Sequence, residues 1–204
     1  LLGGIPVIGK STLALQILPA FTKQVLYVSA EESEEQIGLR ARRLNVNSDS
    51  LHLSSENRIE GILDQVSFIQ PELVVIDSIQ TVFSDALDSL PGSVSQIREC
   101  GQQLLQLAKQ KNIAVMIIGH VTKEGVIAGP KMLEHMVDIV LYIEGDDRHD
   151  HRILRSAKNR FGTSNEVGIF QMESNGLIEV KNPSELFLAE RRDDISGSTI
   201  FPSL

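Results

Sequence analysis

The chain has little of what several classes of protein require. Of its 204 residues one is cysteine, none is tryptophan and 4% are aromatic. The lone Cys100 cannot form an internal disulfide or a zinc knuckle, which excludes a disulfide-stabilised extracellular scaffold. No apolar run approaches the roughly 20 residues of a membrane-spanning helix, and the first residues do not have the pattern of a secretory signal, so none is expected. We therefore expect a cytoplasmic protein with no membrane partner.

Positive charge is also scarce. Lys and Arg number 19 against 27 Asp and Glu, and the formal net charge is −8. Binding to nucleic acid over the whole surface is excluded, because neutralising phosphates requires clustered basic side chains. A local basic patch, such as the lining of a channel, is compatible with an acidic average.

What the chain does have is an alternation of strand and helix patterns. Val25–Ala30, Leu73–Ile76 and Ile113–Ile118 are short apolar runs, and the last two are typical of central strands buried on both faces. Apolar residues at helical spacing predict helices at 58–69 and from Val94 to Ala108. This order predicts an α/β fold with a mainly parallel central sheet flanked by helices.

The pattern changes in the last third of the chain. Pro130 is expected to begin a short helix that carries Met132, Leu133 and Met136. Strands then follow one another at about 137–143, 152–159, 167–172 and 177–180, which predicts an antiparallel C-terminal extension. We expect residues 1–190 to form one domain and residues 191–204 to begin a linker.

A phosphate-binding loop is predicted at the start of the chain. Residues 4–11 read Gly-Ile-Pro-Val-Ile-Gly-Lys-Ser, which matches G-x-x-x-x-G-K-[ST] directly before a helical run. ATP is the implied ligand: Lys10 would bridge its β- and γ-phosphates, and the Ser11 hydroxyl would bind Mg²⁺. The predicted nucleotide-binding residues are Gly4, Ile5, Pro6, Val7, Ile8, Gly9, Lys10, Ser11 and Thr12.

Two features of this loop are unusual. Val7 is β-branched and is disfavoured wherever the loop requires a positive φ, so a reduced affinity for nucleotide is expected. Only Leu1 and Leu2 remain of the strand that should precede the loop. This predicts a chain that begins inside a larger protein.

Acidic residues follow two of the predicted strands. Asp77 comes directly after Leu73–Ile76, where a magnesium-binding aspartate is expected together with Ser11; a carboxylate that caps the next turn is the alternative. Glu31 and Glu32 follow Val25–Ala30. One of them is a candidate to deprotonate the water that attacks the γ-phosphate, although acids at a helix start fit the pair equally well.

His120 ends the strand run that begins at Ile113. It is a candidate sensor of the γ-phosphate, with a purely structural histidine as the alternative. Its spacing to His135 matches no zinc-ligand pattern, so a zinc site is rejected.

Several segments together resemble one family. They are 27–33 (YVSAEES), 91–100, 119–136 and 158–162 (KNRFG), the last identical to a five-residue family signature. The chain is identified by this resemblance as a member of the RadA family, also called Sms, DNA-repair ATPases of the RecA superfamily. The resemblance implies a RecA-like fold and assigns the catalytic carboxylate to Glu31. It further implies that Lys158 and Arg160 act on ATP bound by a neighbouring subunit; from the residues alone, a solvated basic strand end is the alternative.

The same resemblance implies the function. The family hydrolyses Mg-ATP as a hexameric ring, moves on single-stranded DNA and drives branch migration of recombination intermediates, alongside the recombinase RecA. Segments 84–93 and 121–131 match its DNA-facing loops, where Lys123 and Lys131 are available for phosphates. The family also carries a zinc finger before this domain and a Lon-protease-like domain after it, whose beginning the last residues resemble.

One departure leaves other functions open. The family usually reads Gly-Asp-Pro-Gly where this chain has Gly4-Ile5-Pro6-Val7. A nucleotide-binding assembly scaffold that hydrolyses poorly is therefore an alternative. A replicative-helicase or clock-type ATPase on the same fold is another, separated from the leading hypothesis by the Lys158–Gly162 segment.

Overall fold

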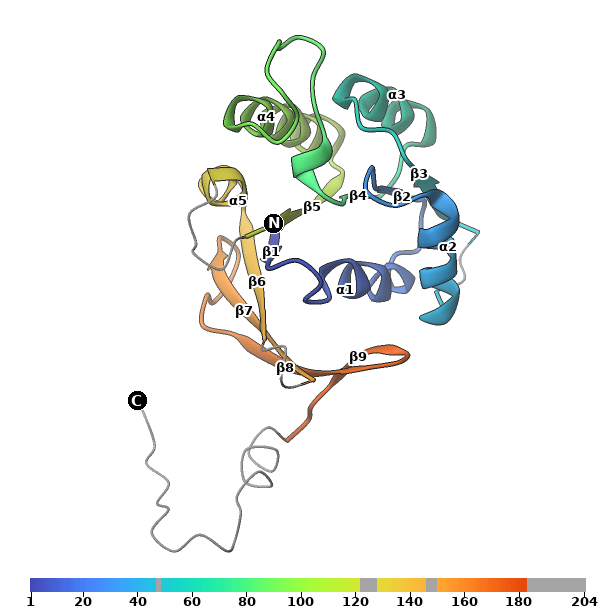
Figure 1. The fold of residues 1–204 in the computed structure, drawn as a ribbon, viewed down its shortest axis with the longest axis vertical. Helices are drawn as coiled ribbons and strands as arrows, with labels where there is room; N and C mark the ends of the chain where they lie inside the picture. The colour runs from blue at the N-terminus through green and yellow to red at the C-terminus, as the bar shows by residue number, and fades with distance from the viewer. Residues whose placement is uncertain (47–48, 122–127, 146–149, 183–204) are drawn as a thin grey trace, which may run out of the picture.

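The computed structural model describes residues 1–46, 49–121, 128–145 and 150–182 of the chain. Within them a nine-stranded sheet runs in the order β3-β2-β4-β5-β1-β6-β7-β8-β9 (Figure 1). The strands are β1 Leu2–Gly4, β2 Val25–Val28, β3 Leu51–Ser54, β4 Leu73–Ile76, β5 Ala114–His120, β6 Ile139–Gly145, β7 His151–Asn159, β8 Val167–Glu173 and β9 Gly176–Glu179. The α-helices are α1 Lys10–Gln16, α2 Glu34–Arg43, α3 Ile59–Ile69, α4 Val94–Lys111 and α5 Ala128–Leu133, and 3₁₀ turns span Leu18–Ala20 and Ile79–Thr81.

The sheet has a parallel part and an antiparallel part. Every neighbouring pair from β3 to β6 is parallel, and β6, β7, β8 and β9 pair antiparallel in sequence order. The predicted α/β class, with its mainly parallel sheet and antiparallel extension, is confirmed. The short β1 lies between β5 and β6, so it joins the two parts.

Helices cover both faces of the parallel part. In Figure 1, α1 and α2 lie on one side of it and α3 and α4 on the other. Because side chains alternate along a strand, Val25 and Tyr27 of β2 pack in the core beneath α1 and α2. Leu26 and Val28 belong to the core beneath α3 and α4.

Local sequence explains where α2 begins. The Ser33 hydroxyl accepts a hydrogen bond from the Gln36 amide, and the Gln36 side chain accepts one from the Ser33 amide. This is a capping box, which satisfies two backbone donors at a helix start that otherwise have no partner. It fixes the point at which the chain turns away from the end of β2.

The structure differs from the sequence prediction at three elements. The edge strand β3 was not predicted, because it is short and polar at His52 and Ser54 and forms only by pairing with β2. Helix α5 begins at Ala128, before Pro130, and ends before Met136. Strand β1 extends to Gly4, so the first glycine of the phosphate-loop motif is itself a strand residue.

The antiparallel extension is attached to the first helix. Gln16 at the end of α1 donates to the Leu177 carbonyl at 3.1 Å and accepts from the Leu177 amide at 2.8 Å. A Cβ at Gly9 would lie 2.7 Å from the methyl carbon of Met172 in β8, so the extension packs directly beneath the phosphate loop. Among the described helices, none combines the length and apolarity needed to cross a bilayer.

Candidate active site

The predicted site residues follow neighbouring strands at one edge of the sheet. The phosphate loop follows β1, Glu31 follows β2, Asp77 follows β4 and His120 ends β5. Because these strands are parallel, their carboxyl ends meet at the same edge, which is where ligands bind in open α/β sheets. A cavity of about 440 Å³ opens there between the loop and the acids, and its lining includes Pro6, Val7, Gly9, Lys10, Ser11, Thr12, Glu31, Glu32, Arg40, Arg43, His120, Arg152 and Met172.

Lys10 lies folded over the loop. Its side chain is buried, with 3% of the residue exposed, and its ammonium group donates to the carbonyls of Gly4 at 3.0 Å and Ile5 at 2.8 Å. Burial lowers the pKa of Lys10 to about 8, while the nearby charges of Asp77 and Glu31 act in the opposite direction. The ammonium group is therefore poorly solvated, which favours exchange of its carbonyl partners for phosphate oxygens.

Val7 has the backbone conformation that its residue type disfavours. Its φ is 64°, in the left-handed region, and 96% of the residue is exposed. Gly9 at the N-terminus of α1 has φ 114°, which costs glycine little. The loop thus has one strained position that glycine would relieve.

Asp77 is held by a side chain from β2, the strand beside β4 in the sheet. The Tyr27 hydroxyl donates to Asp77 Oδ2 at 2.6 Å in a buried contact. Burial and the charge of Asp77 raise the pKa of Tyr27 well above its usual value, and the Ser11 hydroxyl and Arg40 act in the opposite direction. Tyr27 therefore stays a neutral donor at physiological pH.

Glu31 is held by its other neighbours. Its Oε1 accepts a hydrogen bond from the Ser78 hydroxyl at 2.6 Å, and His120 Nε2 lies 3.3 Å from the same oxygen. The Gln80 amide group donates to the His120 carbonyl at 3.1 Å and fixes the end of β5. His120 thus contacts the candidate catalytic carboxylate, a contact that the sequence alone did not predict.

Glu32 has a different environment from Glu31. Its carboxylate forms an ion pair with Arg40 of α2 at 2.5 Å. Of the two adjacent acids, only Glu31 contacts Ser78 and His120.

Three residues of this site were missed by sequence reasoning: Tyr27, Ser78 and Arg152. Arg152 in β7 donates to the Ile8 carbonyl at 3.0 Å and so contacts the phosphate loop from the antiparallel extension. No spacing signal marks these contacts, because each joins segments far apart in sequence. A polar residue next to Asp77 was the one available hint, for Ser78.

Lys158 and Arg160 lie away from the phosphate loop of their own chain. In the β6–β7 register Arg152 pairs with Gly145, near the loop, whereas Lys158 pairs with Val140 at the opposite end. The Lys158 ammonium group donates to the carbonyls of Glu134 and Val137, both at 2.7 Å, just beyond α5. Arg160 forms an exposed ion pair with Asp138 at 3.0 Å.

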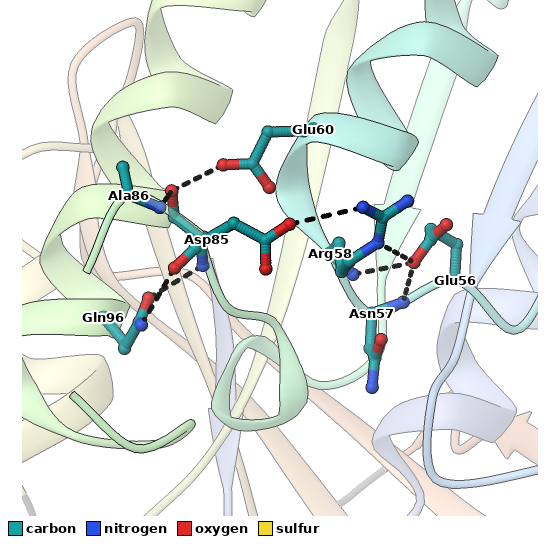
Figure 2. A network of polar contacts seen from close by, with 8 residues as sticks. Glu56, Asn57, Arg58, Glu60, Asp85, Ala86 and Gln96 are labelled. Atoms are coloured by element: carbon teal, nitrogen blue, oxygen red, sulfur yellow. Dashed lines mark hydrogen bonds and ion pairs between the residues drawn. The ribbon is translucent and has the colours of Figure 1, made fainter. Parts of the chain in front are cut away.

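The segment 84–93, predicted to face DNA, is held by side chains from α3 and α4. Gln96 is 1% exposed; it accepts from the Ser84 amide and donates to the carbonyls of Ser84, Leu87 and Ser89. Glu60 accepts from the Ser84 hydroxyl at 2.6 Å, and Arg58 pairs with Asp85 (Figure 2). The base of this segment is therefore preformed.

The second predicted DNA-facing segment is described only in part. Lys131 is an exposed residue of α5, whereas Lys123 lies outside the described residues. The predicted boundary at 190 and the segment 191–204 also lie outside them.

The oxygen donors at this edge fit a magnesium ion. Ser11 and Asp77 offer a hydroxyl and a carboxylate, and Mg²⁺ in nucleotide sites takes few protein oxygens alongside phosphates and water. Asp77 Oδ1 accepts no side-chain hydrogen bond from the described residues. Those residues contain no cluster of three or more His, Cys, Asp or Glu, so an all-protein metal cage is absent from that part of the chain.

Comparison with known proteins identifies the family and the fold of this chain. Residues 1–126 match the family described as AAA domain, and the chain belongs to this family. The structure resembles the KaiC-like protein PH0186 of Pyrococcus horikoshii, with a TM-score of 0.65 at 18% identity over 88% of this chain and 87% of that one. This likeness shows the RecA-like fold.

The resemblance to the RadA family is confirmed by sequence. The chain is 55% identical over its whole length to the DNA repair protein RadA of Listeria monocytogenes and to that of Bacillus subtilis, covering 45% of each. It is 54% identical over 98% of its length to RadA of Streptococcus pneumoniae, covering 48% of that protein. The chain thus spans about half the length of these relatives.

Proposed function

We propose that this chain is the ATP-hydrolysing unit of a DNA-repair motor that moves on single-stranded DNA and drives branch migration of recombination intermediates. The observation that carries the proposal is the gathering of Lys10, Asp77 and Glu31 at one edge of the parallel sheet: Lys10 and Glu31 line one cavity, and Asp77 lies close enough for its charge to act on Lys10. The names of the RadA relatives support the assignment to DNA repair.

The residues around the cavity have complementary roles toward ATP. Lys10 leaves its two carbonyl partners to contact the β- and γ-phosphates. The phosphate oxygens also accept hydrogen bonds from the backbone amides at the N-terminus of α1. Glu31 takes the proton of the attacking water through Oε2, since Oε1 is occupied by Ser78 and His120. Ser11 and Asp77 would hold Mg²⁺, which would supply positive charge against the charge that develops on the phosphates.

Lys158 and Arg160 are proposed to complete the site of a neighbouring subunit. Their position far from their own phosphate loop is what a heterologous ring contact requires, because one surface then meets a different surface of the next copy. We propose a hexameric ring in the cytoplasm, acting with the recombinase RecA on branched intermediates. Lys123 and Lys131 would supply phosphate contacts to DNA.

The test is ATP turnover with and without single-stranded DNA. We expect Lys10→Ala to lower turnover on the order of 100-fold, because it removes a donor to the charge that develops in the transition state. Lys109→Ala, an exposed lysine on α4, is the matched control and should keep parental turnover. Equal turnover in the parent and Lys10→Ala would refute the proposal.

A scaffold that binds nucleotide but hydrolyses it poorly is the second candidate. The positive φ of Val7 favours it, because strain in the loop weakens the enclosure of phosphates. Calorimetric titration with ATP and ADP, followed by turnover of the same sample, separates the two functions. Tight binding without turnover would favour the scaffold. The replicative-helicase or clock-type alternative is disfavoured by Lys158–Gly162 and by the identity to RadA.

A further inference from the structure

The chain contains two tyrosines, and each donates its hydroxyl to a carboxylate. Tyr142 of β6 donates to Glu134, which follows α5 and lies outside the nucleotide cavity. Tyr27 of β2 donates to Asp77 Oδ2, and Asp77 is the candidate metal ligand. The two tyrosines thus make the same chemical contact in different places.

The sheet register explains why Tyr27 meets Asp77. Tyr27 pairs with Val75 in the parallel β2–β4 ladder, and Asp77 lies two residues beyond Val75 on the same face. A tyrosine side chain is long enough to reach this diagonal neighbour. Tyr27 is 1% exposed and Asp77 is 7% exposed, so the contact is shielded from water.

We propose that Tyr27 is a positioning residue for the metal-binding carboxylate. By donating to Oδ2, it fixes the rotation of the Asp77 side chain and leaves Oδ1 as the oxygen presented to the metal of a bound nucleotide. This inference rests on the proposed function, and it adds a role for Tyr27 that the proposed function does not contain. Ser11, the other proposed ligand, also lies close to the Tyr27 hydroxyl.

The alternative is that Tyr27 only fills the core. A buried tyrosine generally needs a hydrogen-bond partner, and its ring belongs to the cluster beneath α1 and α2. The two roles predict different losses on removal of the hydroxyl. A packing role affects folding and all nucleotide binding, whereas a positioning role affects the part of binding that depends on metal. Partners that orient metal ligands change metal affinity about 10- to 100-fold when removed.

The experiment compares Tyr27→Phe with Tyr142→Phe in the full-length protein. For each we would measure calorimetric affinity for ADP with Mg²⁺ and with a chelator, and titrate Mg²⁺ against ATP turnover. We expect Tyr27→Phe to raise the Mg²⁺ concentration for half-maximal turnover about 10-fold, with turnover recovering at saturating Mg²⁺. Metal-free ADP affinity should stay within about twofold, and Tyr142→Phe should leave the Mg²⁺ dependence unchanged.

Two results would overturn the inference. One is a Mg²⁺ dependence in Tyr27→Phe equal to that of Tyr142→Phe. The other is an equal loss of metal-free and metal-dependent binding, including loss by misfolding, which would assign Tyr27 to the core alone. Failure of the proposed function is distinct from both, because the parent protein itself would then show no Mg²⁺-dependent turnover.

Discussion

At the scale of single residues, Val7 shows how one side chain affects the phosphate loop. The residue is β-branched, has φ 64° and is almost fully exposed, so no packing compensates for its conformation. A left-handed conformation costs an L-residue about 1–2 kcal/mol, and glycine avoids that cost. A substitution at Val7 should therefore change the free energy of unfolding, although the Val7 side chain makes few contacts.

We expect Val7→Gly to stabilise the protein by about 1 kcal/mol, since relief of strain exceeds the added flexibility of glycine in the unfolded chain. Affinity for Mg-ATP should rise a few-fold because the loop amides then reach their positions without strain. Thermal unfolding and calorimetry would measure both. The control is Val167→Gly in β8, which should be destabilising. Destabilisation by both substitutions would contradict the assignment of strain to Val7.

The residue scale also shows what sequence reasoning reaches. The strain at Val7, the capping box of Ser33 and the strand-end position of Asp77 follow from local patterns, and the structure contains all three. The partners of the acids do not follow. Tyr27 meets Asp77, and Ser78 meets Glu31, only because β2 and β4 are neighbours in the sheet, and spacing within one segment carries no information about that pairing.

At the scale of elements, the loop between β4 and α4 is organised by one buried glutamine. The side-chain oxygen of Gln96 accepts from the loop, and its amide group donates to the loop, at Ser84, Leu87 and Ser89. These backbone groups of the loop would otherwise lack hydrogen-bond partners. Arg58, directly before α3, and Glu60 of α3 hold the same loop from the other side (Figure 2). The conformation of this loop therefore depends on how the two helices pack against it.

Replacing Gln96 by Leu should lower the free energy of unfolding by about 3 kcal/mol, because buried loop groups lose their partners. The stimulation of ATP turnover by single-stranded DNA should fall more than the basal turnover, if the loop faces DNA. Chemical denaturation and turnover assays with and without DNA check this. Gln102→Leu on the exposed side of α4 is the matched control. Equal loss of basal and stimulated turnover would contradict a DNA-facing loop.

Element prediction from sequence succeeded for α3 and α4, misplaced the ends of α5 and failed for β3. In α3 and α4 apolar residues recur at helical spacing and form a stripe along each helix. This pattern can be recognised without knowledge of the neighbouring elements. Leu51–Ser54 has four residues, and its hydrogen bonds to β2 define it. An edge strand of this kind is specified by its partner, so its own residues indicate it weakly.

At the scale of the whole molecule, the two ends of the sheet carry different groups of candidate site residues. The phosphate loop lies at the carboxyl ends of the parallel strands, and Lys158 and Arg160 lie at the other end of β7. Lys158 caps carbonyls beyond α5, and Arg160 pairs with Asp138. If both residues act on a neighbour, two defective subunits can together form a complete site.

Mixing Lys10→Ala protein with Lys158→Ala protein should recover roughly a quarter of parental turnover, the share of interfaces at which random pairing supplies both intact lysines. Each variant alone should be nearly inactive. Turnover at fixed total protein and varied mixing ratio is the measurement. A mixture of Lys10→Ala with Glu31→Gln, both altered in the same cavity, is the control and should stay inactive. No recovery in the first mixture would contradict action between subunits.

The central position of β1 has a consequence for how the chain reaches its native state. Leu2 pairs with Ile118 on one side and Leu141 on the other, so the strand before the phosphate loop is closed by partners that come much later in the sequence. Contacts of such large sequence separation form slowly, since the intervening chain must first be ordered. Competence to bind nucleotide should therefore be acquired late in folding, after the segment that contains β6 has docked beside β1.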